Sequence, residues 1–239
     1  MTSWQSDVRP LIGLSTYREQ ARWGVWDTSA DLLPTVYAGA IEAVGGVPVL
    51  LPPVASTGES AAALVARLDG LVITGGADVE PRRYAQEAHA RTVRWRSDRD
   101  AWEFALLDAA ESVDLPTLGV CRGMQVMAVR SGGALDQHIP DLVGREDHSP
   151  GDDVYGDIDV DVVPGTQLAR AVGDKSSVSC HHHQAVREHP GFVAAAHAAD
   201  GTLEAMEDPS RPYWMAVQWH PEMREDAGLF RSLVAAASS

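Results

Sequence analysis

The run G-V-C-R-G places Cys121 between Gly119 and Gly123, where residue types and spacing suit a nucleophile. An apolar run, 115–120, precedes the cysteine, and a helix-like stretch, 122–130, follows it. Small flanking residues permit a sharp strand-to-helix turn that pushes the side chain out of the sheet. The N-terminus of the following helix favours the thiolate over the thiol. The alternative is a buried cysteine at a strand end that serves as a small apolar residue.

A cysteine nucleophile needs a base, and the sequence offers nine histidines. His220, in V-Q-W-H-P-E, stands at the end of an apolar strand, where side chains leave the core and reach a cleft. Glu222 could accept a hydrogen bond from the His220 ring and set its tautomer. A solvated His-Pro-Glu turn is the alternative, but the Cys121 turn makes a Cys-His-Glu triad the better interpretation.

Gly75 and Gly76 directly follow another apolar segment and offer backbone amides to an anion. The amide of Gly76 and that of Arg122, the residue after the cysteine, are predicted to form an oxyanion hole. A simple strand-to-loop turn is the alternative interpretation of the two glycines.

The run H-H-H-Q at residues 181–184 invites a metal hypothesis. Consecutive residues of an extended segment point to alternating faces, so three adjacent imidazoles cannot converge on one ion. No H-x-x-x-H or paired-cysteine spacing supports a zinc site elsewhere. We therefore expect no metal and no cofactor, and we place His182 in a pocket wall.

The loop between the third predicted strand and the next helix concentrates basic residues that could hold a substrate carboxylate. Most such clusters are solvated surface, and we expect this of all but one or two of them. The residues are Arg82, Arg83, Arg91, Arg94, Arg96 and Arg99.

Apolar periodicity predicts alternating strands and helices in the first half of the chain, hence parallel βαβ units and a sheet covered on both faces. The predicted strands there are 10–16, 47–51, 70–74 and 115–120, and the helices are 31–44, 60–68, 98–112 and 122–130. The second half predicts shorter, partly antiparallel strands and a closing helix. These strands are 154–163, 178–180, 192–196, 203–206 and 214–218, and the helix is 227–237.

The chain has 239 residues, two cysteines and a net charge of −15. This charge disfavours nucleic acid or an anionic membrane as a partner. Two cysteines argue against a disulfide framework, residues 1–10 lack a signal-peptide pattern, and no apolar run spans a membrane. We expect one domain, 1–239, in the cytoplasm; a homodimer is compatible with the sequence.

The ordered motifs resemble those of class I glutamine amidotransferase-like hydrolases, and more narrowly the γ-glutamyl-γ-aminobutyrate hydrolase family, peptidase C26. The motifs are R-P-L-I-G-L-S-T, A-I-E-A-V-G-G-V-P-V-L-L-P, V-I-T-G-G-A-D-V-E-P-R-R-Y, G-V-C-R-G-M-Q-V-M-A-V-R-S-G-G-A-L-D-Q-H-I-P-D, H-H-H-Q-A-V and A-V-Q-W-H-P-E. The resemblance implies a three-layer α/β/α sandwich, with a mostly parallel sheet. The chain departs from the family pattern at Ala128, where relatives often carry Asn, and at Cys180, where Ser is common.

By this resemblance Cys121 is the nucleophile, His220 the base and Glu222 its partner, while Gln125 lines a glutamyl pocket. The implied reaction is cofactor-free hydrolysis of a small γ-glutamyl amide through a thioester, as in polyamine catabolism. The leaving amine is γ-aminobutyrate or a polyamine derivative. Two alternatives stay open: a glutaminase subunit that delivers ammonia to a separate synthetase, and a non-catalytic binding protein that retains the fold.

Overall fold

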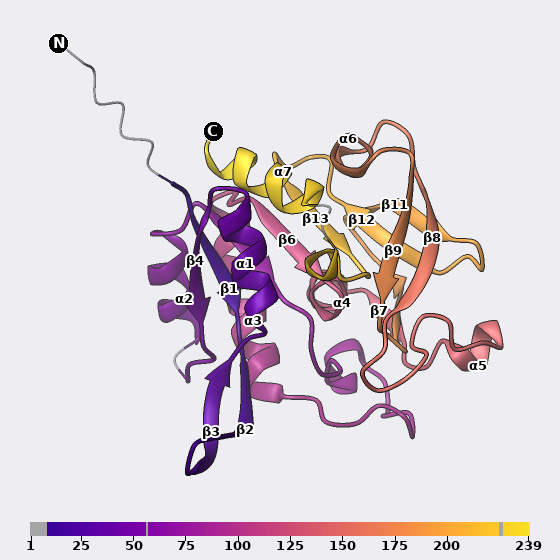
Figure 1. The fold of residues 1–239 in the computed structure, drawn as a ribbon, viewed down its shortest axis with the longest axis horizontal. Coiled ribbons are helices and arrows are strands. Elements are labelled where there is room, and N and C mark those ends of the chain that lie inside the picture. Colours follow the sequence, from indigo (N-terminus) through magenta and orange to yellow (C-terminus); the bar gives the residue numbers. More distant parts are fainter. Residues whose placement is uncertain (1–8, 56, 225–226) are drawn as a thin grey trace.

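A nine-stranded mixed sheet forms the centre of the protein in the computed structural model, which describes residues 9–55, 57–224 and 227–239 (Figure 1). Five adjacent strands are parallel, and the remaining four continue the sheet in antiparallel pairings. Their spatial order is β4 (Val47–Leu51), β1 (Leu11–Ser15), β5 (Gly70–Ile73), β6 (Thr117–Val120), β13 (Trp214–Val217), β12 (Leu203–Glu207), β11 (Val193–Ala198), β8 (Gly156–Val162) and β9 (Lys175–Cys180).

Helices cover both faces of this sheet and give the expected three layers. One face packs against α2 (Thr57–Val65), α3 (Ser97–Ser112) and α4 (Arg122–Arg130), and the other against α1 (Thr35–Ala43), α6 (Gln167–Val172) and α7 (Gly228–Ala237). Strand β5 shows the reason: Leu71 and Ile73 enter one core and Val72 the other. A strand that is buried on both faces has to be apolar throughout, as β5 is. The prediction of an α/β fold is confirmed.

The predicted helix 31–44 is wrong at its start, because Asp31 and Leu32 belong to a strand. Strands β2 (Tyr17–Trp23) and β3 (Trp26–Leu32) form a separate antiparallel hairpin that is mostly exposed. An exposed hairpin has no apolar face, so periodicity gave no signal for it. Further short elements were also missed: η1 (Pro81–Tyr84), β7 (Ala134–Asp136), α5 (Pro140–Val143), α6 (Gln167–Val172), β10 (Ala185–Glu188) and η2 (Pro221–Met223).

The remaining predicted helices and strands are present, with ends that differ by three residues or fewer. Because β5, β6 and β13 are neighbouring parallel strands, the turns that follow them meet at one edge of the sheet. That edge therefore receives Gly75 and Gly76, Cys121 and His220.

None of the helices in the described ranges is long and apolar enough to cross a membrane. The expected absence of a signal peptide concerns residues 1–10. Of these, residues 1–8 lie outside the described residues.

Candidate active site

Cys121 occupies a sharp turn between β6 and α4, with φ +52° and ψ −107°. For a residue with a Cβ this positive φ is strained by about 1–3 kcal/mol. The flanking glycines let strand and helix approach closely enough to hold it. A Cβ on Gly123 would lie 2.0 Å from the carbonyl oxygen of Ile73, and one on Gly119 would lie 2.7 Å from the sulfur of Met127.

His220 and Glu222 form a close pair beside this turn. Nδ1 of His220 lies 2.6 Å from Oε1 of Glu222, and both residues are buried. A Cβ built on Gly75 would lie 3.1 Å from Cε1 of His220 and 3.6 Å from Cβ of Cys121, so the imidazole and the cysteine flank the same glycine. The structure thus brings together the three residues of the predicted triad.

The electrostatics favour an imidazolium at this position. Burial alone would lower the pKa of His220, but the hydrogen-bonded Cys121 sulfur and the Glu222 carboxylate together raise it well above its usual value. A thiolate and an imidazolium are the protonation states of an activated cysteine nucleophile.

Three side chains that the sequence analysis did not select complete the surroundings. The Tyr155 ring meets the His220 ring edge-on, with centroids 5.1 Å apart. Nε2 of Gln218 donates to the Cys121 sulfur at 3.8 Å, and the Tyr37 hydroxyl accepts the amide hydrogen of Gly75 at 3.1 Å. Gln218 lies inside the A-V-Q-W-H-P-E motif and so was detectable, whereas the two tyrosines arrive from segments distant in sequence.

A cavity of about 210 Å³ opens beside the cysteine, and Gly76, Arg122, Gln125 and His182 all line it. The backbone of Gly76 has φ +138°, and a Cβ there would lie 2.2 Å from Nη1 of Arg99. Only glycine therefore fits this position without displacement. The two predicted oxyanion donors lie on the wall that holds Cys121.

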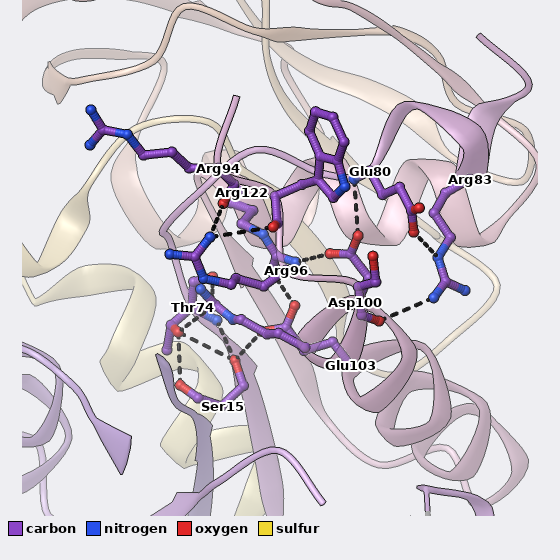
Figure 2. A network of polar contacts seen from close by, with 12 residues as sticks. Ser15, Thr74, Glu80, Arg83, Arg94, Arg96, Asp100, Glu103 and Arg122 are labelled. Atoms are coloured by element: carbon purple, nitrogen blue, oxygen red, sulfur yellow. Dashed lines mark hydrogen bonds and ion pairs between the residues drawn. The ribbon is translucent and has the colours of Figure 1, made fainter. Parts of the chain in front are cut away.

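The Arg122 guanidinium is buried and turned into a network of ionic contacts behind that wall (Figure 2). It pairs with the carboxylates of Asp100 and Glu103. Arg99 also pairs with Glu103, at 2.8 Å, and donates to the carbonyl oxygen of Gly75 at 2.8 Å. Arg99 was grouped with the loop arginines in the sequence analysis; it is a buried residue of α3 that supports the glycine turn.

The two predicted pocket residues already contact other protein groups. Nε2 of Gln125 donates to the carbonyl oxygen of Gln184 at 3.2 Å. His182 lies in the pocket wall, as expected, but its Nδ1 faces the carbonyl of Gln184 at 3.0 Å and its Nε2 faces Glu204 at 3.4 Å.

A larger cavity of about 670 Å³ adjoins the first, since the two share Asp78, Ser149, His181 and His183. Its lining mixes acidic and basic side chains, and part of this charge is neutralised internally, because Arg96 pairs with Glu19 at 2.6 Å. The Asp78 carboxylate lies 3.1 Å from Nε2 of His183. Its other charged residues are Arg91, Arg94 and Asp152.

Comparison with known proteins yields one family and one fold. The peptidase C26 family model matches residues 10–222. A mycobacterial protein named "Putative glutamine amidotransferase Rv2859c" (Mycobacterium tuberculosis) is 47% identical over 96% of this chain and 75% of its own. Gamma-glutamyl-gamma-aminobutyrate hydrolase PuuD of Escherichia coli K12 is 29% identical over 89% of this chain and 85% of its own.

Among solved structures, the glutaminase domain of Trypanosoma brucei CTPS, with bound acivicin, aligns with a TM-score of 0.63. It is 17% identical and the match covers 95% of this chain and 93% of that one, so this likeness concerns the fold. The match of the family model and the curated relatives agree with the motifs and with the observed architecture. The chain belongs to the peptidase C26 family of glutamine amidotransferase-like hydrolases.

Proposed function

We propose that this protein hydrolyses a γ-glutamyl amide to glutamate and a free amine through a thioester on Cys121. The observation that carries the proposal is the Cys121 turn, with φ +52°, set beside the His220–Glu222 pair joined at 2.6 Å. Membership of a hydrolase family, with a 29% identical relative named as a γ-glutamyl-γ-aminobutyrate hydrolase, supports it.

In the proposed reaction the Cys121 thiolate attacks the γ-carbonyl carbon, and the amides of Gly76 and Arg122 stabilise the oxyanion. The C–N bond then breaks as His220 donates its proton to the leaving amine. His220, now neutral, removes a proton from water, which attacks the thioester and releases glutamate and the thiolate. Glu222 holds the imidazole in orientation throughout.

The 670 Å³ cavity lies where the amine side of the substrate would extend. Within the described chain, the side chains of Arg91 and Arg94 have no carboxylate partner, and Figure 2 shows Arg94 directed away from the buried network. Asp78 and Asp152 supply opposing charges in the same cavity. The Asp78 carboxylate already contacts His183 and the Val93 amide. The guanidinium groups of Arg91 and Arg94 are therefore available to a leaving amine that carries a carboxylate, such as γ-aminobutyrate.

The test compares glutamate release from γ-glutamyl-γ-aminobutyrate, a γ-glutamyl polyamine and glutamine. We expect Cys121→Ala to abolish turnover while circular dichroism shows an intact fold, and the matched variant Cys180→Ala to leave the catalytic thiol in place. Arg94→Ala should raise KM for γ-glutamyl-γ-aminobutyrate more than for glutamine, with kcat little changed. Undiminished turnover by Cys121→Ala would refute the mechanism.

Substrate preference separates this proposal from the glutaminase alternative. A glutaminase would hydrolyse glutamine best, and would do so strongly only with a synthetase present. Selective labelling of Cys121 over Cys180 by a thiol-directed glutamine analogue would exclude a non-catalytic binding protein, because such a protein needs no activated thiol.

A further inference from the structure

A second group of chemically capable side chains lies in and behind the pocket wall and has no part in the proposed reaction. It consists of His148, Cys180, His182 and Glu204, all buried, with one potential ligand atom from each lying within 4.8 Å of the others. The four come from the loop before β8, the end of β9, the segment after it and strand β12. No two of them have the spacing of a sequence motif, so the sequence predicted no metal.

The two nitrogens and one carboxylate oxygen of this group are spaced as in a coordination shell. Nδ1 of His148 lies 3.2 Å from Nε2 of His182 and 3.1 Å from Oε1 of Glu204, and Nε2 of His182 lies 3.4 Å from the same oxygen. The Cys180 sulfur lies 3.7 Å from Oε2 of Glu204. Ligands placed tetrahedrally around zinc at its usual bond lengths are separated by about 3.3–3.6 Å.

One oxygen in the group also lacks a partner. Oε1 of Glu204 is completely buried and accepts no hydrogen bond of acceptable geometry from any described residue, although two imidazole nitrogens lie close to it. An unsatisfied buried carboxylate oxygen costs free energy. A cation at the common centre would satisfy it together with both nitrogen lone pairs.

The outer hydrogen bonds of both imidazoles are those that metal-bound histidines make. Nε2 of His148 lies 2.9 Å from Oδ2 of Asp200, and Nδ1 of His182 lies 3.0 Å from the carbonyl oxygen of Gln184. Donation of the outer N–H fixes the tautomer that leaves the inner nitrogen free as a ligand.

We propose that His148, Cys180, His182 and Glu204 bind a structural Zn²⁺ ion. A thiolate and two imidazoles select zinc over magnesium or calcium, which prefer oxygen ligands. Zn²⁺ replaces the Cys180 thiol proton, which passes to solvent, and both imidazoles bind neutral. Two positive charges, one thiolate and one carboxylate leave the buried shell electrically neutral. Four protein ligands leave no open position for catalysis.

The consequence for the fold is local and specific. The ion would join the loop that carries His148 to strand β12 and to the segment 181–184, which lines the cavity beside Cys121. His182 would then orient the pocket wall through the metal and would not contact substrate through Nε2.

The test measures metal, so it is independent of the proposed reaction. The full chain is stripped with a chelator, reloaded with Zn²⁺ and assayed for bound metal by mass spectrometry; Co²⁺ serves as the spectroscopic probe. We expect one Zn²⁺ per chain, and with Co²⁺ the absorption of a tetrahedral site including a thiolate-to-cobalt charge-transfer band. Asp200→Asn should weaken Zn²⁺ binding by about 10- to 100-fold.

Matched cysteine and histidine variants locate the site. Cys180→Ser should abolish the charge-transfer band, whereas Cys121→Ser should retain it. His182→Asn should lose the bound Zn²⁺. His183→Asn, a change at the neighbouring histidine, should still bind one Zn²⁺ per chain. Absence of Zn²⁺ uptake by the folded wild-type chain, or a band that survives Cys180→Ser and disappears with Cys121→Ser, would overturn the proposal. Circular dichroism of each variant distinguishes loss of metal from loss of fold.

Discussion

Glu103→Gln should be among the most damaging single substitutions to stability, although it removes only one charge. Glu103 is completely buried, and its carboxylate contacts Arg99 at 2.8 Å, the Ser15 hydroxyl at 2.8 Å and the Arg122 guanidinium (Figure 2). Asp100 is the other carboxylate of this network, so the two acids balance the two arginines. A glutamine leaves one buried positive charge without compensation.

The expected loss is about 3–5 kcal/mol in the free energy of unfolding, the range measured when one partner of a buried ionic group is removed. That is a large part of the about 5–15 kcal/mol that stabilises an ordinary protein. Equilibrium urea denaturation measures it. Glu111→Gln is the matched control, because Glu111 also lies on α3 and pairs with two arginines, Arg130 and Arg211, but is partly exposed. There we expect less than about 1 kcal/mol.

The pH dependence of the stability difference between wild type and Glu103→Gln supplies a second criterion. Burial raises the pKa of Glu103, but Arg122 and Arg99 outweigh it and hold the pKa below its usual value. A lowered carboxylate pKa stabilises the fold above the unfolded-state pKa, and this contribution is lost as pH falls through the folded-state value. The stability gap between wild type and Glu103→Gln should therefore be constant near neutrality and narrow in acid. Equal losses for Glu103→Gln and Glu111→Gln, or a gap that widens in acid, would refute the reasoning.

Three further changes probe the site. Glu222→Gln removes a charge that raises the pKa of His220, so the alkaline limb of kcat/KM should move to lower pH; an unmoved limb would contradict the proposed role of His220 as acid. Gly123→Ala forces a Cβ against the Ile73 carbonyl and should cost about 1–3 kcal/mol by thermal denaturation, while Gly39→Ala, with open space around it, should be neutral or stabilising. Tyr37→Phe leaves the buried Gly75 amide without its acceptor and should cost about 1–3 kcal/mol in urea denaturation.

The parallel half of the fold was predictable because each of its strands is an apolar run bounded by glycine or proline. The run G-L-V-I before Gly75 and the run T-L-G-V before Cys121 are both fully buried strands. Parallel pairing of such strands sets their following turns at one edge, so the convergence of the glycine turn and the cysteine follows from the order of elements. His220 joins them because β13, which was expected among the partly antiparallel strands, pairs in parallel with β6. The hairpin β2–β3 was not predictable, because its residues face solvent.

The candidate site was predictable where residues follow the predicted strands or are neighbours in sequence. His220 and Glu222 stand two positions apart, and their pairing needed no knowledge of the fold. Arg99 looked like one of several loop arginines, since nothing local distinguishes a buried guanidinium from a solvated one. His148 and Glu204 showed no pattern at all, because their approach to Cys180 depends on the pairing of antiparallel strands.

The buried network gives the Arg122 side chain a role of its own, beside that of its amide in the proposed reaction. Its guanidinium anchors the first turn of α4 to Glu103 on α3, and Arg99 on the same helix holds the carbonyl of Gly75. Helix α3 thus fixes both backbone segments that supply the proposed oxyanion amides, one after β5 and one after β6. Oxyanion donors that are fixed before the charge develops need no reorganisation during a reaction, and such preorganisation is the general source of their catalytic effect. Arg122 therefore combines two roles at one position: it lines the cavity beside Cys121, where its amide is the proposed donor, and its guanidinium anchors the turn to α3.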